Sequence, residues 1–381
     1  MARRPELDAL RGLMLVLITF THVPTVFADR FSQPFGFVSA AEGFVFLSAF
    51  LTGAIYTGIA RNSGCAAMRA ALWRRARKIY FAHAGMLLFL FTIIAAIGIS
   101  AQRPAVKNLI SFYLGHPGTG LWTGFALIYN PPLLDILPMY VLFMLVSPLV
   151  LTLAFKRGWR VILAASLAIW ACAQFGLANL LYAGLVGATR LKVPLQETGA
   201  FQLVAWQLLW VLGMWLGWSA ASGRERVWEF PRWLVWTAIA LATWALLWRH
   251  LVGQQPFGAA SLYNILADKW QLAPLRLLNF LALLVLAVRF GPQLAPLLAR
   301  LHFLEVLGKA SLPVFCAQLV IALLALCAIG DRFESVPVWD QAVLLGASFA
   351  VLYAVARSVE GKKRAAVRRA APMRPASARA G

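Results

Sequence analysis

The chain has 381 residues, of which 61% are hydrophobic and only 13% are charged, and its mean hydropathy is +0.75. These values exclude an ordinary soluble domain and indicate a protein that crosses a membrane several times. The formal net charge of +21 would suit a nucleic-acid-binding protein, but most Lys and Arg residues lie at the ends of apolar segments, so we expect no nucleic acid among the partners. The four cysteines show neither a disulfide framework nor a metal-ligand spacing.

The apolar runs predict an all-α membrane bundle of about ten spanning helices, each of about 20 residues. Lys and Arg concentrate in alternate connecting segments, and this positive-inside pattern predicts that both termini are cytoplasmic. We expect residues 1–360 to form one transmembrane domain and residues 361–381 to form a disordered basic cytoplasmic tail. In chain order, the expected spans are 10–28, 36–58, 79–100, 133–155, 161–182, 201–221, 233–252, 274–290, 306–329 and 339–358.

The first expected span carries Arg11 and His22 on one stripe of the helix. Their separation of about eleven residues is close to three full turns and gives a rise of about 16 Å, half of the hydrocarbon thickness. Arg11 would therefore lie at the cytoplasmic surface and His22 near mid-depth. Ionisable side chains inside a membrane are costly, so we interpret His22 as functional, with a helix-packing histidine as the alternative. Arg11 alone would also fit a snorkelling interface anchor.

Glu42 and Gln318 are expected at the same depth as His22. Glu42 lies about 9 Å from the outer end of its span, so it would meet His22 if the first two spans pack together. A carboxylate beside an imidazole would raise its basicity and fix its tautomer, as a general base requires. The alternative is that Glu42 only neutralises a neighbouring cation. Gln318 would either polarise a carbonyl group or hold two helices together through its amide.

Two connecting segments have compositions that suit anionic or sugar ligands. The basic run at residues 74–78 is a topology anchor, and it is also a concentrated positive surface for docking an anionic nucleotide. Residues 253–273 on the outer side contain Tyr, Trp and amide side chains, which are typical both of sugar binding and of membrane interfaces. The sequence contains no phosphate-binding loop, zinc motif or serine-hydrolase motif, so we expect chemistry that uses a cosubstrate and no metal.

Several motifs follow one another along the chain and, with Arg-x10-His on the first span, resemble the membrane acyltransferase-3 superfamily. Within it the sequence is most similar to the OpgC family of osmoregulated periplasmic glucan succinyltransferases, over nearly the whole length. The motifs are Leu7-Asp8-x-x-Arg11-Gly12, the run from Ser39 to Ser48, Arg74-x-x-Arg77-x-x-Tyr80-x-x-His83, Asp135-Ile136-Leu137-Pro138-x-Tyr140, Asp268-Lys269, Pro274-Leu275-Arg276-Leu277-Leu278 and Gly308-x-x-Ser311-Leu312-Pro313-Val314-Phe315.

The resemblance implies an acyltransferase of the bacterial inner membrane, which moves an acyl group from a cytoplasmic acyl-CoA to a hydroxyl of a periplasmic glucan. It implies that His22 is the catalytic histidine and that Arg11 helps to hold the CoA portion. The family has Asp just before this histidine, whereas this chain has Thr21. We therefore expect Glu42 to be the carboxylate partner of His22. The family reads Ser-Gly-Phe where this chain has Ser48-Ala49-Phe50. The further residues expected around CoA are Arg74, Arg77, Lys78 and His83, and those expected along the glucan path are Asp135, Asp268, Lys269 and Gln318.

Several alternatives stay open at this point. The acyl group is succinyl or acetyl, donated by succinyl-CoA or acetyl-CoA, and the glycan is a periplasmic glucan or another envelope polysaccharide. Direct transfer and a covalent acyl-histidine are both consistent with the sequence. A proton-coupled transporter or a non-catalytic partner of a glucan synthase would use the same fold class. The expected partners are acyl-CoA, the glycan and the lipid bilayer, and self-association into a homo-oligomer is left open.

Overall fold

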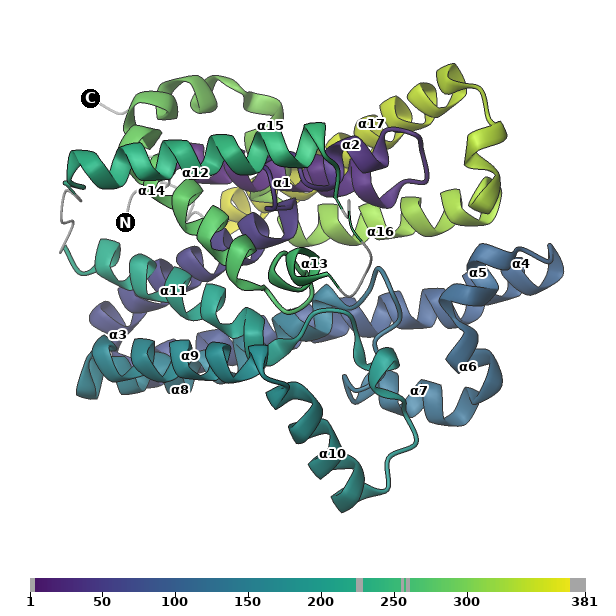
Figure 1. Cartoon of the computed structure of the whole chain (residues 1–381), viewed down its shortest axis with the longest axis horizontal. Helices are drawn as coiled ribbons and strands as arrows, with labels where there is room; N and C mark the ends of the chain where they lie inside the picture. The colour runs from purple at the N-terminus through teal and green to yellow at the C-terminus, as the bar shows by residue number, and fades with distance from the viewer. Residues whose placement is uncertain (1–3, 224–228, 255–256, 258–260, 371–381) are drawn as a thin grey trace, which may run out of the picture.

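The computed structural model describes residues 4–223, 229–254, 257 and 261–370, and all regular elements in these ranges are helices (Figure 1). Within them, seven helices are long and apolar enough to cross a membrane, or up to eight if one bent pair counts as a span. We expected about ten. The difference arises at α1, at α3 and at the pair α9 and α10, where the helix boundaries differ from those predicted.

The first helix, α1 (Pro5–His22), is shorter than the expected span and begins earlier. Proline occupies its first turn, where the missing N–H costs no hydrogen bond, and the chain turns away directly after His22. Glu6, Asp8 and Arg11 all fall within its 18 residues, so α1 is not among the seven apolar helices. His22 therefore lies at the end of a helix rather than in the middle of the expected span 10–28.

Two expected spans, 36–58 and 79–100, belong to one long helical stretch. It comprises α3 (Ala40–Phe89), the π-helical turn η1 (Leu90–Ile94) and α4 (Ala95–Ser100). Gly64 interrupts α3 with φ 84° and ψ 164°, a conformation that favours glycine. Tyr56 before this break and Arg75 after it line the same cavity, so both halves of α3 contribute to its wall.

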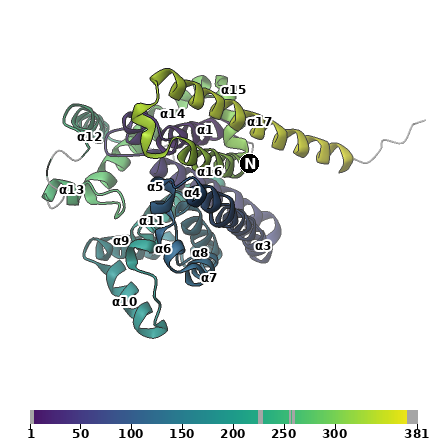
Figure 2. The same ribbon diagram turned by 90° about the vertical axis from the view of Figure 1, so that its right-hand side faces the viewer.

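The expected span 161–182 is bent in the structure. Helix α9 (Trp159–Gln174) and helix α10 (Leu177–Thr189) meet at 83°, and Gly176 between them has a left-handed conformation. None of the residues of α10 is buried, and the helix projects from the bundle in both views (Figures 1 and 2).

The remaining six expected spans correspond to helices of the bundle. Of these, α17 continues to Ala370, so a helix extends into the segment for which the composition predicts a disordered tail, while residues 371–381 lie outside the described residues. Figure 2 shows the C-terminal part of α17 projecting from the bundle. The helices are α8 (Ile136–Arg157), α11 (Leu203–Ala221), α12 (Arg232–Leu251), α14 (Pro274–Arg300), α15 (His302–Lys309) with α16 (Ser311–Ala328), and α17 (Val338–Ala370).

Shorter helices connect these elements. The segment between residues 101 and 132 forms three of them, and two others lie in the loops after α1 and before α14. They are α2 (Ala28–Ser32), α5 (Pro104–Leu109), α6 (Ser111–Gly115), α7 (Pro117–Phe125) and α13 (Leu262–Leu266), with the 3₁₀ turns η2 (Leu195–Thr198) and η3 (Gly330–Ser335).

Glycines allow α1 and α15 to cross in backbone contact. A Cβ on Gly12 would lie 1.9 Å from the carbonyl oxygen of Leu304, and a Cβ on Gly308 would lie 1.8 Å from that of Asp8. Small residues at a helix crossing permit this close approach inside a membrane. The crossing brings Arg11, next to Gly12, to Ser311 at the beginning of α16, and the Arg11 guanidinium donates a hydrogen bond to the Ser311 hydroxyl.

Candidate active site

His22 and Gln318 face each other across α1 and α16. Nδ1 of the imidazole lies 3.0 Å from Nε2 of the Gln318 amide, and Gln318 is completely buried. The sequence predicted that the two side chains share one depth, and this contact confirms it. An amide on Nδ1 fixes the orientation and the tautomer of the ring, which leaves Nε2 as the nitrogen available for proton transfer or for a substrate.

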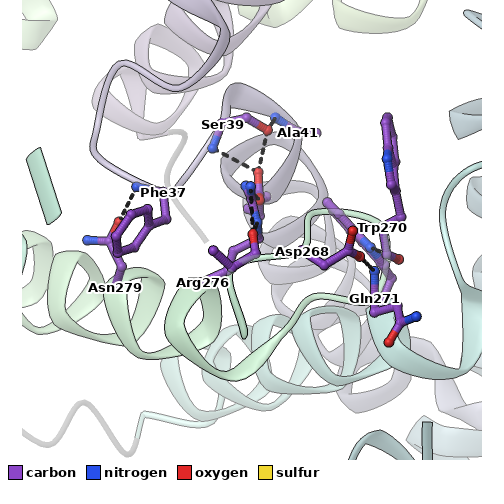
Figure 3. Close-up of polar contacts among 11 residues, drawn as sticks. Phe37, Ser39, Ala41, Asp268, Trp270, Gln271, Arg276 and Asn279 are labelled. Atoms are coloured by element: carbon purple, nitrogen blue, oxygen red, sulfur yellow. Dashed lines mark hydrogen bonds and ion pairs between the residues drawn. The ribbon is translucent and has the colours of Figure 1, made fainter. Parts of the chain in front are cut away.

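Glu42 does not occupy the position beside His22 that we expected for it. Its carboxylate is completely buried and forms an ion pair of 2.7 Å with Arg276, while its second oxygen accepts hydrogen bonds from the backbone N–H of Ser39 at 3.0 Å and from the Ser39 hydroxyl at 2.5 Å. In Figure 3 the Arg276 side chain points toward Ser39 and Ala41 at the beginning of α3. The amide of Gln318 therefore has the contact with His22 that we assigned to this carboxylate.

The local sequence explains why Glu42 turns toward Ser39. Ser39 is the N-cap of α3, and Ser39 with Glu42 three residues later forms a complete capping box. This motif satisfies N–H groups that the first turn of a helix otherwise leaves without a partner. Arg276 in the first turn of α14 then compensates the buried charge and also donates to the carbonyl of Ala267 at 3.4 Å. The pair thus joins α3, α14 and the loop before α14.

Lys269, in that loop, brings an ammonium group close to this network. Its Nζ lies 4.8 Å from the ring centroid of Trp270 and 5.8 Å from that of Phe201, and no carboxylate of the described residues lies within 4 Å of it. Burial lowers the pKa of Lys269 below its ordinary 10.5; Glu42 and Asp135 oppose this effect, and Arg276 adds to it. The charge of Lys269 also acts on His22.

The two predicted acidic residues of the glucan path have structural contacts. Asp135, which precedes α8, accepts a hydrogen bond of 3.2 Å from the backbone N–H of Ala200, and Asp268 accepts one of 2.7 Å from the backbone N–H of Gln271 (Figure 3). Asp135 contributes to the field around Lys269, so it belongs to the same polar region. The hydrogen bond between Asp268 and Gln271 stabilises the turn that contains Lys269. Residues 255–256 and 258–260 of the expected sugar-binding loop lie outside the described residues.

A basic cavity of about 320 Å³ opens between α1, both halves of α3, α8, α16 and α17. Its lining contains no acidic side chain among the described residues. Of the residues expected around CoA, Arg11 and Lys78 line it, whereas Arg74 and Arg77 do not and are exposed. The cationic side chains that line the cavity are Arg11, Arg75, Lys78, Lys309 and Lys363.

Three aromatic rings form the inner wall of this cavity. Phe44 stacks on Phe315 with ring centroids 5.9 Å apart, and it lies 6.1 Å from Tyr140. The hydroxyls of Ser48 and Tyr140 are buried in the lining without a hydrogen-bond partner in the described part of the chain. Phe315 precedes Gln318 by about one helical turn, so the contact between Gln318 and His22 lies about one turn of α16 away from this wall.

The position of His83 differs from that of the basic residues that precede it. Its ring is completely buried in the second half of α3 and does not line the basic cavity. In the described structure, His83 therefore does not contact a ligand bound in that cavity. The described residues contain no cluster of His, Cys, Asp or Glu that would hold a metal ion.

The sequence contains signals for the residues that our prediction missed. Leu72, Ala76, Ile79 and His83 are buried at helical spacing, and this apolar stripe indicates which face of α3 points inward. Arg75 lies about 70° from the centre of this stripe, closer to it than Arg74 or Arg77, which would have favoured Arg75 over both. The capping-box pattern at Ser39 would likewise have indicated that Glu42 faces its own helix terminus.

One family model, described as OpgC protein, matches residues 3–364, which is nearly the whole chain. The matched range contains both sides of the site, from Arg11 and His22 to Gln318 and Lys363. No curated protein and no solved structure matches the chain.

Proposed function

Because the chain belongs to the OpgC family, we propose that it is an O-acyltransferase of the bacterial inner membrane, which moves a succinyl group from cytoplasmic acyl-CoA to a hydroxyl of a periplasmic glucan. The family suggests a glucan-modifying acyltransferase, and the apolar helices indicate a membrane protein. The observation that carries the finer proposal is the position of the His22–Gln318 pair about one turn of α16 from the inner wall of a cavity lined by cationic side chains.

The basic cavity has the chemistry that the donor requires. The phosphates of CoA are multiply charged anions, and Arg and Lys side chains bind them through charge-assisted hydrogen bonds. Arg75 and Lys78 would hold the phosphates at the mouth of the cavity, and Arg11 would hold the donor deeper in the cavity. The hydroxyls of Ser48 and Tyr140 would hydrogen-bond the amide groups of the donor's connecting arm.

His22 would act as the general base. A sugar hydroxyl is a weak nucleophile at neutral pH, so its proton must be removed as the oxygen attacks the thioester carbonyl. The new C–O bond forms, the C–S bond breaks, and the proton passes through His22 to the leaving thiolate. For this role Nε2 needs a free lone pair. Rotation of the Gln318 amide by half a turn would present its carbonyl oxygen to Nδ1–H and leave Nε2 unprotonated.

Lys269 would select the acyl group. Glu42 and Arg276 compensate each other, whereas the ammonium of Lys269 is held over aromatic rings without a carboxylate within 4 Å in the described residues. A succinyl group carries a distal carboxylate, and this anion would pair with Lys269 while the thioester carbon lies at His22. An acetyl group has no such anion and gains nothing from Lys269.

Inverted membrane vesicles test the proposal. Vesicles that contain the wild-type protein should consume labelled succinyl-CoA in a glycan-dependent way, and mass spectrometry should find the label on the glycan. His22→Ala should abolish this transfer, whereas His250→Ala, which changes an exposed histidine at the end of α12, should not. Transfer by the His22→Ala protein at the wild-type rate would refute the proposal. Glycan movement without thioester consumption would indicate a transporter.

A further inference from the structure

A second and larger cavity, of about 1500 Å³, lies between the pair α12 and α14 and the helices α1, α3 and α11. Its body is apolar and includes Leu10, Phe46, Trp236 and Leu284. It does not share a lining residue with the basic cavity. We refer to it as the α12–α14 groove.

The helices that form this groove leave their apolar side chains largely uncovered. In α14 no residue beyond Ala282 is buried, and in α12 only Ala238, Ala245 and Arg249 are buried. Both helices are nevertheless apolar enough to cross a membrane. Within a bilayer the groove is filled by an apolar occupant, which is either lipid acyl chains or another apolar protein surface.

One end of the groove is charged, and it is the end that the distribution of Lys and Arg predicts to be cytoplasmic. Arg4, Arg232 and Arg289 line this end together with Glu6 and Glu229, so the cations are in excess. A second copy of the chain docked on the same face at the same depth would bring two such cationic ends together, which is unfavourable. An anionic group at this end is favourable.

The part of the groove between its charged residues and its far end fits one membrane leaflet. It extends along α1 from Arg4 to Met14 and along α14 from Phe280 to Arg289, about 15 and about 14 Å at 1.5 Å per residue, which is half of a hydrocarbon core of about 30 Å. Beyond Arg289 the lining continues to Leu298. We propose that the α12–α14 groove binds one anionic phospholipid of the cytoplasmic leaflet, with its acyl chains along α1, α3 and α14 and its phosphate against Arg232 and Arg289.

This lipid would have a structural consequence for the active site. The groove extends to Ser39 and Phe280, and Ser39 caps the helix whose Glu42 is paired with Arg276 of α14. A bound lipid would fill the space behind α14 and support the position of its first turns. The phospholipid would therefore stabilise the fold as well as occupy the surface.

The test uses the purified full chain in mild detergent, with native mass spectrometry and thermal unfolding as readouts. Phosphatidylglycerol should bind and raise Tm, and phosphatidylcholine should do so much less. The double variant Arg232→Gln/Arg289→Gln should weaken phosphatidylglycerol binding by about tenfold or more. The control Arg157→Gln/Arg160→Gln removes the same charge from exposed positions outside the groove and should bind as the wild type does.

A second variant tests the acyl-chain part of the groove. Ala287 lines the groove and is exposed, so Ala287→Trp fills the groove without disturbing a buried contact, and it should reduce the number of tightly bound lipids by one. Equal lipid binding by the wild type, the double variant and Ala287→Trp would overturn the proposal. A lipid-free dimer whose formation Ala287→Trp prevents would also overturn it. Neither result depends on acyl transfer.

Discussion

Nδ1 of His22 lies 3.0 Å from the side-chain amide of Gln318, so the candidate base is held by a neutral partner rather than by a carboxylate. Thr21 stands where relatives are expected to have Asp, and Glu42 is engaged by Arg276 and Ser39. An amide can fix the tautomer of the imidazole, but it does not stabilise a positive charge on the ring as a carboxylate does.

Replacement of Gln318 should impair the chemical step. Gln318→Ala should lower kcat by about 10²-fold, the lower end of the contribution of a positioned base, with little change in KM for acyl-CoA. Gln318→Glu should retain more activity, with its rate optimum at a different pH, because a carboxylate would then face Nδ1. Steady-state kinetics over a range of pH separate this role from simple packing. A wild-type kcat for Gln318→Ala would exclude it.

The basic cavity should set the affinity for the donor. Arg75→Gln/Lys78→Gln should raise KM for acyl-CoA by about tenfold or more for each charge, since a hydrogen bond to a charged group contributes about 1.5–3 kcal/mol. The matched control is Arg74→Gln/Arg77→Gln, which removes two charges from exposed positions of the same helix. Equal effects of the two double variants would mean that only the general positive potential matters.

The buried ion pair between Glu42 and Arg276 should stabilise the fold, with the two residues strongly coupled. Glu42→Gln or Arg276→Met should each cost about 3–5 kcal/mol, because each leaves an uncompensated buried charge. Removal of both charges should cost less than the sum of the two single changes. Thermal unfolding of the four proteins in one detergent gives the coupling directly. Additive losses would show that the pair is not coupled.

The titration of Lys269 should distinguish the two acyl donors. If its ammonium binds the succinyl carboxylate, transfer from succinyl-CoA should decline as pH rises through the lowered pKa, below 10.5, while transfer from acetyl-CoA should not show this decline. Lys269→Met should remove the succinyl preference and leave acetyl transfer. Between the lowered and the ordinary pKa the folded chain binds fewer protons than the unfolded chain, so stability should rise with pH there in the wild type but not in Lys269→Met.

The crossing of α1 and α15 should tolerate no side chain at Gly12. Gly12→Val would force the two backbones apart, because even a Cβ would lie 1.9 Å from the Leu304 carbonyl oxygen, and we expect a loss of at least about 1–3 kcal/mol together with a displaced Arg11. Gly58→Ala is the control, since a Cβ there meets nothing within 4 Å. Comparable Tm values for the two variants would contradict the close crossing.

The sequence predicted the helical class and most of the spans because each apolar run is long enough to be recognised by itself. It could not predict that Gly64 interrupts a helix that continues on both sides, or that α9 and α10 meet at 83°. Both features depend on single glycines, whereas Gly213 and Gly217 leave α11 intact. A hydropathy profile does not show such breaks in a helix.

Only part of the site could be predicted from the sequence, for a similar reason. His22 and Gln318 were recognised because a polar residue at mid-depth is conspicuous, and their common depth follows from helical rise alone. The partner of Glu42 was not recognised, because its choice between His22 and Arg276 depends on the rotation of α3 and on the position of α14. Arg75 was missed because the basic run was treated as a block rather than as successive positions around a helix.

The end of α1 at His22 gives the imidazole an electrostatic environment that no side chain supplies. The last carbonyl groups of a helix carry a partial negative charge of about half an elementary charge, and His22 belongs to the last turn of α1. When His22 takes a proton, the positive ring therefore forms beside the negative pole of its own helix. In this chain the backbone dipole of α1 supplies part of the charge stabilisation that a neighbouring carboxylate would otherwise have to provide.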